Sequence, residues 1–204
     1  VKQTIYNKDY SVNAIFSLKE YGFINFGIHN QKIEYQNTYV TETLNYYSAD
    51  INIDQIDNLL YPKAGFLYDI SFETGNQDYN YYISSIAFDH YVPLSSNIRI
   101  KIYGDALLSN LKSFDNNQLI LKSINYIPYD RTLSFSQFDL FVTEFTSYGI
   151  EVNMDYKNST TFRLLYNTIN RAEFKHSNYV INNVGSYALG LRIKSILGPL
   201  NFMW

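Results

Sequence analysis

The sequence predicts an all-β fold, an antiparallel sheet that forms part of a transmembrane β-barrel. Apolar and polar residues alternate with a period of two in segment after segment, as expected for strands with two unlike faces. The clearest case is the last hairpin, 187–204, where Tyr187, Leu189 and Leu191 alternate with small or basic residues. Strands of this kind suit a barrel that has lipid outside and water inside.

The composition supports this fold class and excludes several others. With 204 residues the chain is long enough for one sizeable domain. Its 21 Tyr and 14 Phe are too many for a disordered chain, and they suit the aromatic girdles of a barrel at the two bilayer interfaces. No run approaches the roughly 18 apolar residues of a transmembrane helix. A net charge of -3 gives no argument for nucleic acid, and the absence of Cys excludes disulfides and thiolate metal sites.

The first half of the chain contains strand-like segments joined by short polar turns. Gly, Pro, Asn and Ser mark the turns, and alternating apolar residues mark the strands. We expect strands at 12–19, 23–35, 41–58, 66–73, 82–88 and 98–103, with turns at 20–22, 61–65 and 92–97.

The second half begins with a region rich in Asn, Asp and Ser, 109–138, which we expect to be a long loop with one strand-like piece at 118–122. Clean alternation resumes at 148–157 and continues at 162–167. In total we expect about 10 to 12 strands of roughly 9 to 14 residues, near the length that crosses a bilayer at a tilt.

The alternation assigns side chains to two faces. We expect a lipid-facing set and a lumen-lining set, the latter a solvated inner wall with cross-strand ion pairs. The lipid-facing set is Phe66, Ile70, Phe72, Ile98, Ile100, Ile102, Ile150, Val152, Leu189 and Leu191. The lumen-lining set is Arg99, Lys101, Glu151, Asp155, Arg163, Arg192 and Lys194, with Glu73 and Asp89 also on the polar side of their strands.

Motifs of catalysis and cofactor binding are missing from the sequence. There is no Gly-x-Ser-x-Gly elbow, His-Glu-x-x-His or P-loop. The three histidines, His29, His90 and His176, lack the spacing of metal ligands. We therefore expect no catalytic residue, no metal site and no cofactor, and no hydrolase activity from this chain alone.

Two motifs carry a resemblance to a known family. The stretch 57–66 resembles the D-N-x-x-[FY]-P-x-x-G hairpin of the Omp85 superfamily, the bacterial surface antigen or BamA/TamA-like outer-membrane barrels. Its matching residues are Asp57, Asn58, Tyr61, Pro62 and Gly65. The end of the chain resembles the closing G-x-R-x-x-x-x-x-G-P-[LI]-x-F hairpin of the same superfamily, through Gly190, Arg192, Gly198, Pro199 and Phe202.

The resemblance implies a 16-stranded barrel in a Gram-negative-type bacterial outer membrane, of which residues 1–204 would be the C-terminal part. The family carries an Arg-Gly-[Phe/Tyr] tip on a loop that folds into the lumen, whereas 124–141 contains Arg131 but no Gly. This departure favours the offshoot in which the barrel is an autotransporter-like anchor or translocator for a patatin-like phospholipase passenger. The alternative within the family is a BamA/TamA-type barrel that assembles or inserts outer-membrane proteins.

A third hypothesis comes from another class, a soluble β-sandwich binding module whose alternating strands bury one face in a core. Alternation over about ten residues, as at 148–157, favours a bilayer over such a module. The chain starts at Val1 without an initiator Met or export signal, so we expect it to be the mature or excised part of a longer protein. The expected partners are outer-membrane lipid and a passenger in the same polypeptide, with no nucleic acid; a homo-oligomer is left open.

Overall fold

The computed structural model describes residues 5–35, 40–58, 60–76, 80–110, 142–157, 159–174, 179–195 and 198–204. These residues form one antiparallel sheet of ten strands, which confirms the predicted all-β fold class and the partial barrel. The strands are β1 (Ile5–Ser17), β2 (Gly22–Tyr35), β3 (Val40–Asp54), β4 (Gly65–Asn76), β5 (Asn80–Pro93), β6 (Ile98–Ser109), β7 (Val142–Tyr156), β8 (Thr160–Phe174), β9 (Tyr179–Ser195) and β10 (Gly198–Met203).

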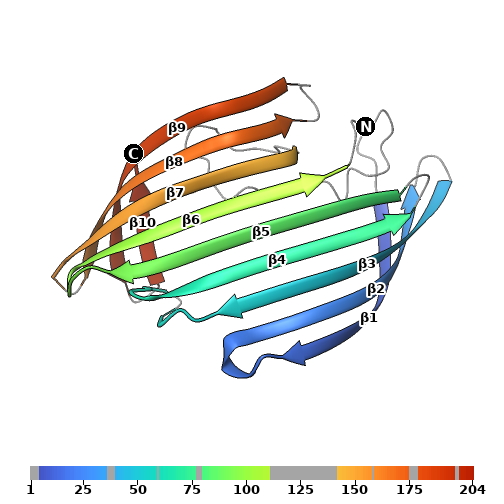
Figure 1. Cartoon of the computed structure of the whole chain (residues 1–204), viewed down its shortest axis with the longest axis horizontal. Helices are drawn as coiled ribbons and strands as arrows, with labels where there is room; N and C mark the ends of the chain where they lie inside the picture. The colour runs from blue at the N-terminus through green and yellow to red at the C-terminus, as the bar shows by residue number, and fades with distance from the viewer. Residues whose placement is uncertain are drawn as a thin grey trace.

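The sheet is a meander in which each strand pairs with its neighbours in the chain, in the order β1 to β10. Figure 1 shows it bent into a deep, open trough. The turns after β1, β3, β5, β7 and β9 lie at one end of the trough, which we call the turn end. Among the described strands, β1 pairs only with β2 and β10 only with β9, so these two strands are the edges of the sheet.

The strands are long. β1 to β9 contain 12 to 17 residues each, more than the roughly 9 to 11 residues that a tilted strand needs to cross a bilayer. The pairing of β7 with β8 shifts register between Thr146 and Ser147, a bulge that adds local twist. No helix in the described ranges is long and apolar enough to cross a membrane.

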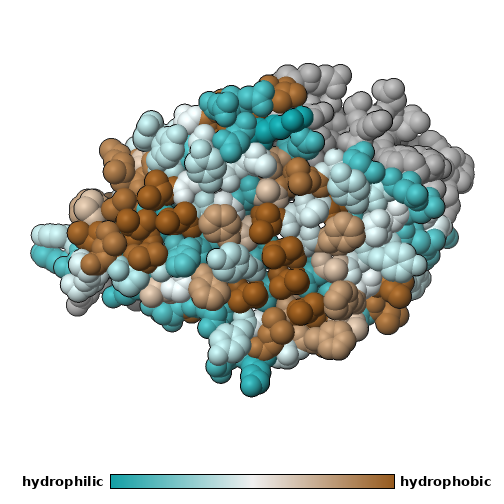
Figure 2. All heavy atoms as spheres, viewed as in Figure 1, coloured by the Kyte–Doolittle hydropathy of each residue, from teal (hydrophilic) through white to brown (hydrophobic). Residues whose placement is uncertain are grey.

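The convex face of the sheet is apolar. Tyr187 and Leu189 are 77% and 61% exposed, and Ile102 and Ile150 are cross-strand neighbours that both point outward. Figure 2 shows hydrophobic side chains in a broken band over the face turned to the viewer. All ten residues of the predicted lipid-facing set lie on this face, each half-buried or exposed: Phe66, Ile70, Phe72, Ile98, Ile100, Ile102, Ile150, Val152, Leu189 and Leu191.

The concave face buries both polar and apolar side chains. Its buried charged and amide side chains are Gln31, Arg99, Lys101, Glu151, Asn153, Arg163 and Asn167. Nine apolar or aromatic side chains are buried on the same face: Tyr46, Tyr81, Ile83, Tyr103, Leu107, Phe145, Leu165, Ile169 and Ala188. A soluble β-sandwich buries apolar faces between two sheets, whereas the described strands form one sheet with charges inside. The sandwich hypothesis is therefore wrong for these strands.

Two local features differ from the expected elements. The strand expected over 41–58 ends at Asp54, because the polar residues after it fold into the turn that leads to Gly65. The corner at 20–22 contains a single 3-10 turn, η1 (Lys19–Tyr21), which alternation does not predict. Most of the loop expected over 109–138, including the strand-like piece 118–122 and Arg131, lies outside the described residues.

Candidate functional site in the lumen

Asp57 closes the β3–β4 turn, which we define as residues 55–64. Its carboxylate accepts hydrogen bonds from the backbone N–H groups of Lys63 at 2.8 Å and Ala64 at 3.2 Å. Burial alone would raise the pKa of the Asp57 carboxyl, but these N–H donors favour the charged form and hold its pKa below the ordinary value. The turn is therefore built around an ionised carboxylate.

Asn58 and Gly65 complete the fold of this turn. The Asn58 side-chain oxygen accepts hydrogen bonds from the N–H groups of Leu60 at 3.0 Å and Tyr61 at 2.9 Å. Gly65 has a φ of +109°, and a Cβ at this position would collide with the carbonyl oxygen of Gln55. The motif residues thus fold the turn tightly.

The β3–β4 turn reaches across the trough to the far strands. The Lys194 ammonium on β9 lies 4.6 Å from the centroid of the Tyr61 ring, a cation–π contact. Pro62 is buried, and it lines a cavity together with Arg192, also on β9. The two sequence motifs that carry the family resemblance therefore meet in space.

The wall that faces the turn contains a nearly inaccessible ion pair between neighbouring strands. Arg163 on β8 donates to both oxygens of Glu151 on β7, from Nε at 2.5 Å and from Nη2 at 2.9 Å. Only 7% of Arg163 and 3% of Glu151 is exposed. Two parallel N–H···O bonds give this pair a fixed geometry.

Two more ion pairs extend the wall toward β5 and toward the turn end. Arg99 lies 2.7 Å from Asp155, which also accepts a hydrogen bond from the Thr161 hydroxyl at 2.6 Å. Lys101 lies 2.9 Å from Asp89 on β5. Each of these cations is thus paired with its own carboxylate.

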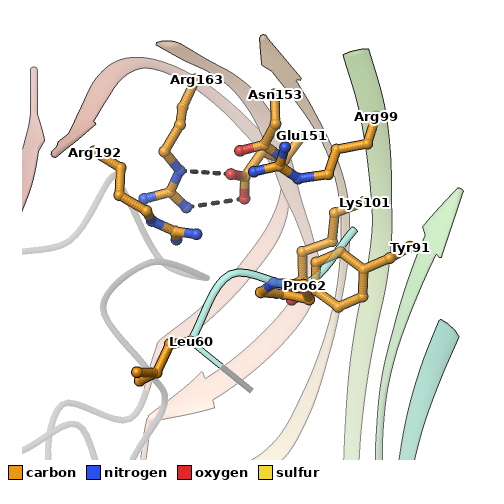
Figure 3. A pocket seen from close by; sticks show the side chains of 9 residues that line it. All are labelled: Leu60, Pro62, Tyr91, Arg99, Lys101, Glu151, Asn153, Arg163 and Arg192. Carbon is orange, nitrogen blue, oxygen red and sulfur yellow. Dashed lines mark hydrogen bonds and ion pairs between the residues drawn. The ribbon is translucent and has the colours of Figure 1, made fainter. Parts of the chain in front are cut away.

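Between the turn and the wall is a cavity of about 170 Å³, shown in Figure 3. Side chains from the β3–β4 turn cover one side, and side chains from β5 to β9 form the rest. The lining residues are Leu60, Pro62, Tyr91, Arg99, Lys101, Glu151, Asn153, Arg163 and Arg192.

Arg192 differs from the other three cations of the cavity. Its Nε donates to the side-chain oxygen of Asn201 at 2.8 Å, and no carboxylate among the described residues forms an ion pair with it. Figure 3 shows its guanidinium pointing into the cavity beside that of Arg163. Within the part of the chain that the structure describes, Arg192 is therefore the cation of the cavity that has no ion pair of its own, and Glu151, the nearby carboxylate, is already paired with Arg163.

The structure places the predicted residues as follows. The lumen-lining set, Arg99, Lys101, Glu151, Asp155, Arg163, Arg192 and Lys194, lies on the concave face, and the cavity gathers Arg99, Lys101, Glu151, Arg163 and Arg192 from it. Of the closing hairpin, Gly190 and Pro199 occupy this same face, while Phe202 points outward and is 46% exposed. Gly198 has a φ of +110°, which accounts for glycine at the start of β10.

Sequence reasoning missed three residues of the cavity. Asn153 lies two residues from both Glu151 and Asp155, so the alternation could have placed it on the same wall. Tyr91 likewise lies two residues after Asp89 and therefore on the same face. No sequence signal identifies Leu60, because only the folded turn brings it to the wall.

A second polar group lies on the concave face of β1 to β3. His29 Nε2 is 3.0 Å from the Ser48 hydroxyl, its Nδ1 is 3.8 Å from Asp9, and its ring stacks on Tyr46 at 4.2 Å. The Tyr46 hydroxyl in turn donates to Asp9 at 3.2 Å. These contacts give the buried ring of Tyr46 polar partners and hold three strands together.

His90 lies on the convex face beside Phe66, and His176 is outside the described residues. Over the described ranges, no group of three His, Cys, Asp or Glu side chains is placed to hold a metal ion.

No family model and no curated protein matches the sequence. Among solved structures, the chain is similar to BamA from Haemophilus ducreyi lacking POTRA domains 1–3, with a TM-score of 0.71 and 15% sequence identity. The match covers 99% of this chain and 51% of that chain, so this chain spans about half the length of BamA in that structure. The likeness shows the fold: the ten strands form part of a β-barrel like that of BamA.

Proposed function

We propose that the chain is part of an Omp85-type barrel in a bacterial outer membrane, where it serves as a membrane anchor or translocator. The observation that carries this proposal is the placement of side chains, which is the reverse of that in a soluble protein. Ile, Leu, Phe and Tyr cover the convex face, while Arg, Lys and Glu are buried on the concave face. Lipid would solvate the convex face, whereas water would meet an apolar surface much larger than soluble monomers expose.

The turn end of the lumen supports a role as an anchor. Ion-paired side chains fill the wall there, and the β3–β4 turn covers it, leaving a cavity of about 170 Å³. Such packing suits a barrel that holds a passenger in the membrane. We propose that the passenger is a patatin-like phospholipase in the same polypeptide, on the strength of the family resemblance and the missing Arg-Gly tip. The barrel itself then performs no chemistry.

Expression of the full polypeptide in a Gram-negative host tests this proposal. We expect the protein in the outer-membrane fraction, soluble only in detergent, with phospholipase activity in the full polypeptide and none in residues 1–204. A monodisperse monomer without detergent would contradict the barrel. Ester hydrolysis by residues 1–204 alone would contradict the division of roles.

The similarity to BamA favours a second candidate function, the assembly or insertion of other outer-membrane proteins. Proteoliposomes containing the full protein can be mixed with a urea-unfolded outer-membrane protein, and folding followed by gel mobility. Faster folding than in protein-free liposomes would favour assembly. Equal rates would favour the anchor.

The edges of the sheet also require partners. In hydrocarbon the unpaired backbone groups of β1 and β10 would cost several kcal/mol each. We propose that further strands of the same polypeptide close the barrel. The mass of the detergent-solubilised protein distinguishes this arrangement from closure by a second copy.

A further inference from the structure

We propose that the cavity under the β3–β4 turn binds a small oxyanion of the phosphate type, with Arg192 as its principal ligand. The charges of the site are unbalanced. Four cations line the cavity, and three of them are paired with Asp155, Asp89 and Glu151. Among the described residues, the fourth cation, Arg192, forms no ion pair with a carboxylate of its own.

The donors of Arg192 are suited to an anion. Its Nε is used by Asn201, so the two Nη groups form the fork that faces the cavity in Figure 3. A guanidinium fork donates two parallel hydrogen bonds to phosphate or carboxylate oxygens. The neighbouring guanidinium of Arg163 repels Arg192, and an anion between them would relieve this repulsion.

The cover of the cavity strengthens the interaction. Pro62 is apolar and buried, so it excludes water from one side of the site, whereas Leu60 at the rim is 55% exposed. An ionic hydrogen bond gains strength where the local dielectric constant is low. The β3–β4 turn thus makes the site more favourable for an anion than the same cations would be on an open surface.

Shape and size indicate a phosphate group. The volume of about 170 Å³ is enough for a phosphate group. The cations reach the cavity from three strands, β6, β8 and β9. A tetrahedral anion presents oxygens in all these directions, whereas a planar carboxylate presents two in one plane.

Binding of inorganic phosphate to the full-length protein in zwitterionic detergent, measured by calorimetry, tests the site. We expect saturable binding that is stronger than the binding of acetate. Arg192→Gln should weaken it by at least about tenfold, the usual size of a lost ionic hydrogen bond. Arg192→Lys, which keeps the charge but loses the fork, should give an intermediate loss.

Lys157→Gln is the matched control. It removes one positive charge at the same end of the sheet, from an exposed turn where Lys157 stacks on Tyr156 at 5.2 Å, outside the cavity. We expect its phosphate affinity to stay within about twofold of the parent, as for a distant screened charge. Heat-modifiable gel mobility shows whether each variant is folded.

Three results would overturn the proposal: no saturable phosphate binding, full affinity in a folded Arg192→Gln variant, or an equal loss in Lys157→Gln. Competition by vesicles containing phosphatidic acid, but not by phosphatidylcholine vesicles, would identify a lipid headgroup as the source of the phosphate. Binding of inorganic phosphate without such competition would identify the free ion.

Discussion

Arg163 and Glu151, on neighbouring strands, form a two-point ion pair on the concave face of the sheet, with almost no exposure to solvent. Removing one partner leaves the other charge buried and unpaired, which costs a large amount of folding free energy. Replacing both partners by apolar residues costs far less. The pair is therefore sensitive to single substitutions.

Glu151→Gln should lower the free energy of unfolding by about 3 kcal/mol or more, because it leaves the Arg163 guanidinium buried without a carboxylate. Urea unfolding of the protein in detergent micelles measures this change. Glu144→Gln is the control, since Glu144 pairs with Arg171 at 2.7 Å where both side chains are partly exposed. It should cost less than about 1 kcal/mol. Equal losses in the two variants would refute the special role of burial.

Ile86→Arg should destabilise the membrane-embedded protein by about 2 to 4 kcal/mol. Ile86 is on the convex face near the middle of β5, between Ile70 and Ala106 on the adjacent strands, where we expect hydrocarbon. Val92→Arg, on the same face but at the turn end of β5, should cost only about 0 to 1 kcal/mol. Unfolding titrations in lipid vesicles measure both, and the absence of any depth dependence would contradict a bilayer around this face.

Ser84→Cys and Ser85→Cys should react differently with a water-soluble thiol reagent. The two serines are adjacent on β5 and point to opposite faces, with Ser85 in hydrogen-bond contact with Ser71 at 2.6 Å on the concave side. The parent has no Cys, so each variant carries one thiol. In proteoliposomes we expect labelling at position 85 and protection by lipid at position 84. The reverse pattern would show that the concave face meets lipid and the convex face meets water.

Asp57→Asn should cost about 1 kcal/mol at neutral pH, because the ionised carboxylate accepts two N–H groups of the β3–β4 turn. The pKa of Asp57 is lowered on folding, so its contribution is complete above the ordinary Asp value of 3.8 and disappears as the pH falls through the lower folded value. Unfolding of the parent and the variant from pH 7 to pH 2 measures the difference.

The control for Asp57→Asn is Glu20→Gln, which removes an exposed carboxylate in the turn after β1. It should behave as the parent over the same range. A stability difference for Asp57→Asn that grows as the pH falls would have the wrong sign for a lowered pKa.

The strands could be predicted because alternation reports a property of each strand by itself. In β7, Ile150, Val152 and Met154 face one way, while Glu151 and Asn153 face the other, and the chain shows this without any partner. The 3-10 turn of η1 escaped prediction because three residues are too few to show a period.

The cavity could be predicted only in part, since it depends on which residues become neighbours across strands. Alternation places Arg163 and Glu151 on the polar face, but their pairing depends on the register of β7 against β8. The meeting of Tyr61 with Lys194 is harder still, because it follows from the curvature of five strands that lie between them. Local patterns contain no such information.

The contact between Tyr61 and Lys194 also sets a mechanical constraint on the sheet. Strand pairing alone allows a sheet to open or tighten by small changes in twist at each ladder. The β3–β4 turn spans the trough from β4 to β9, so its length limits how far these two strands can move apart. At the turn end, flattening the sheet would therefore separate this tyrosine from this lysine.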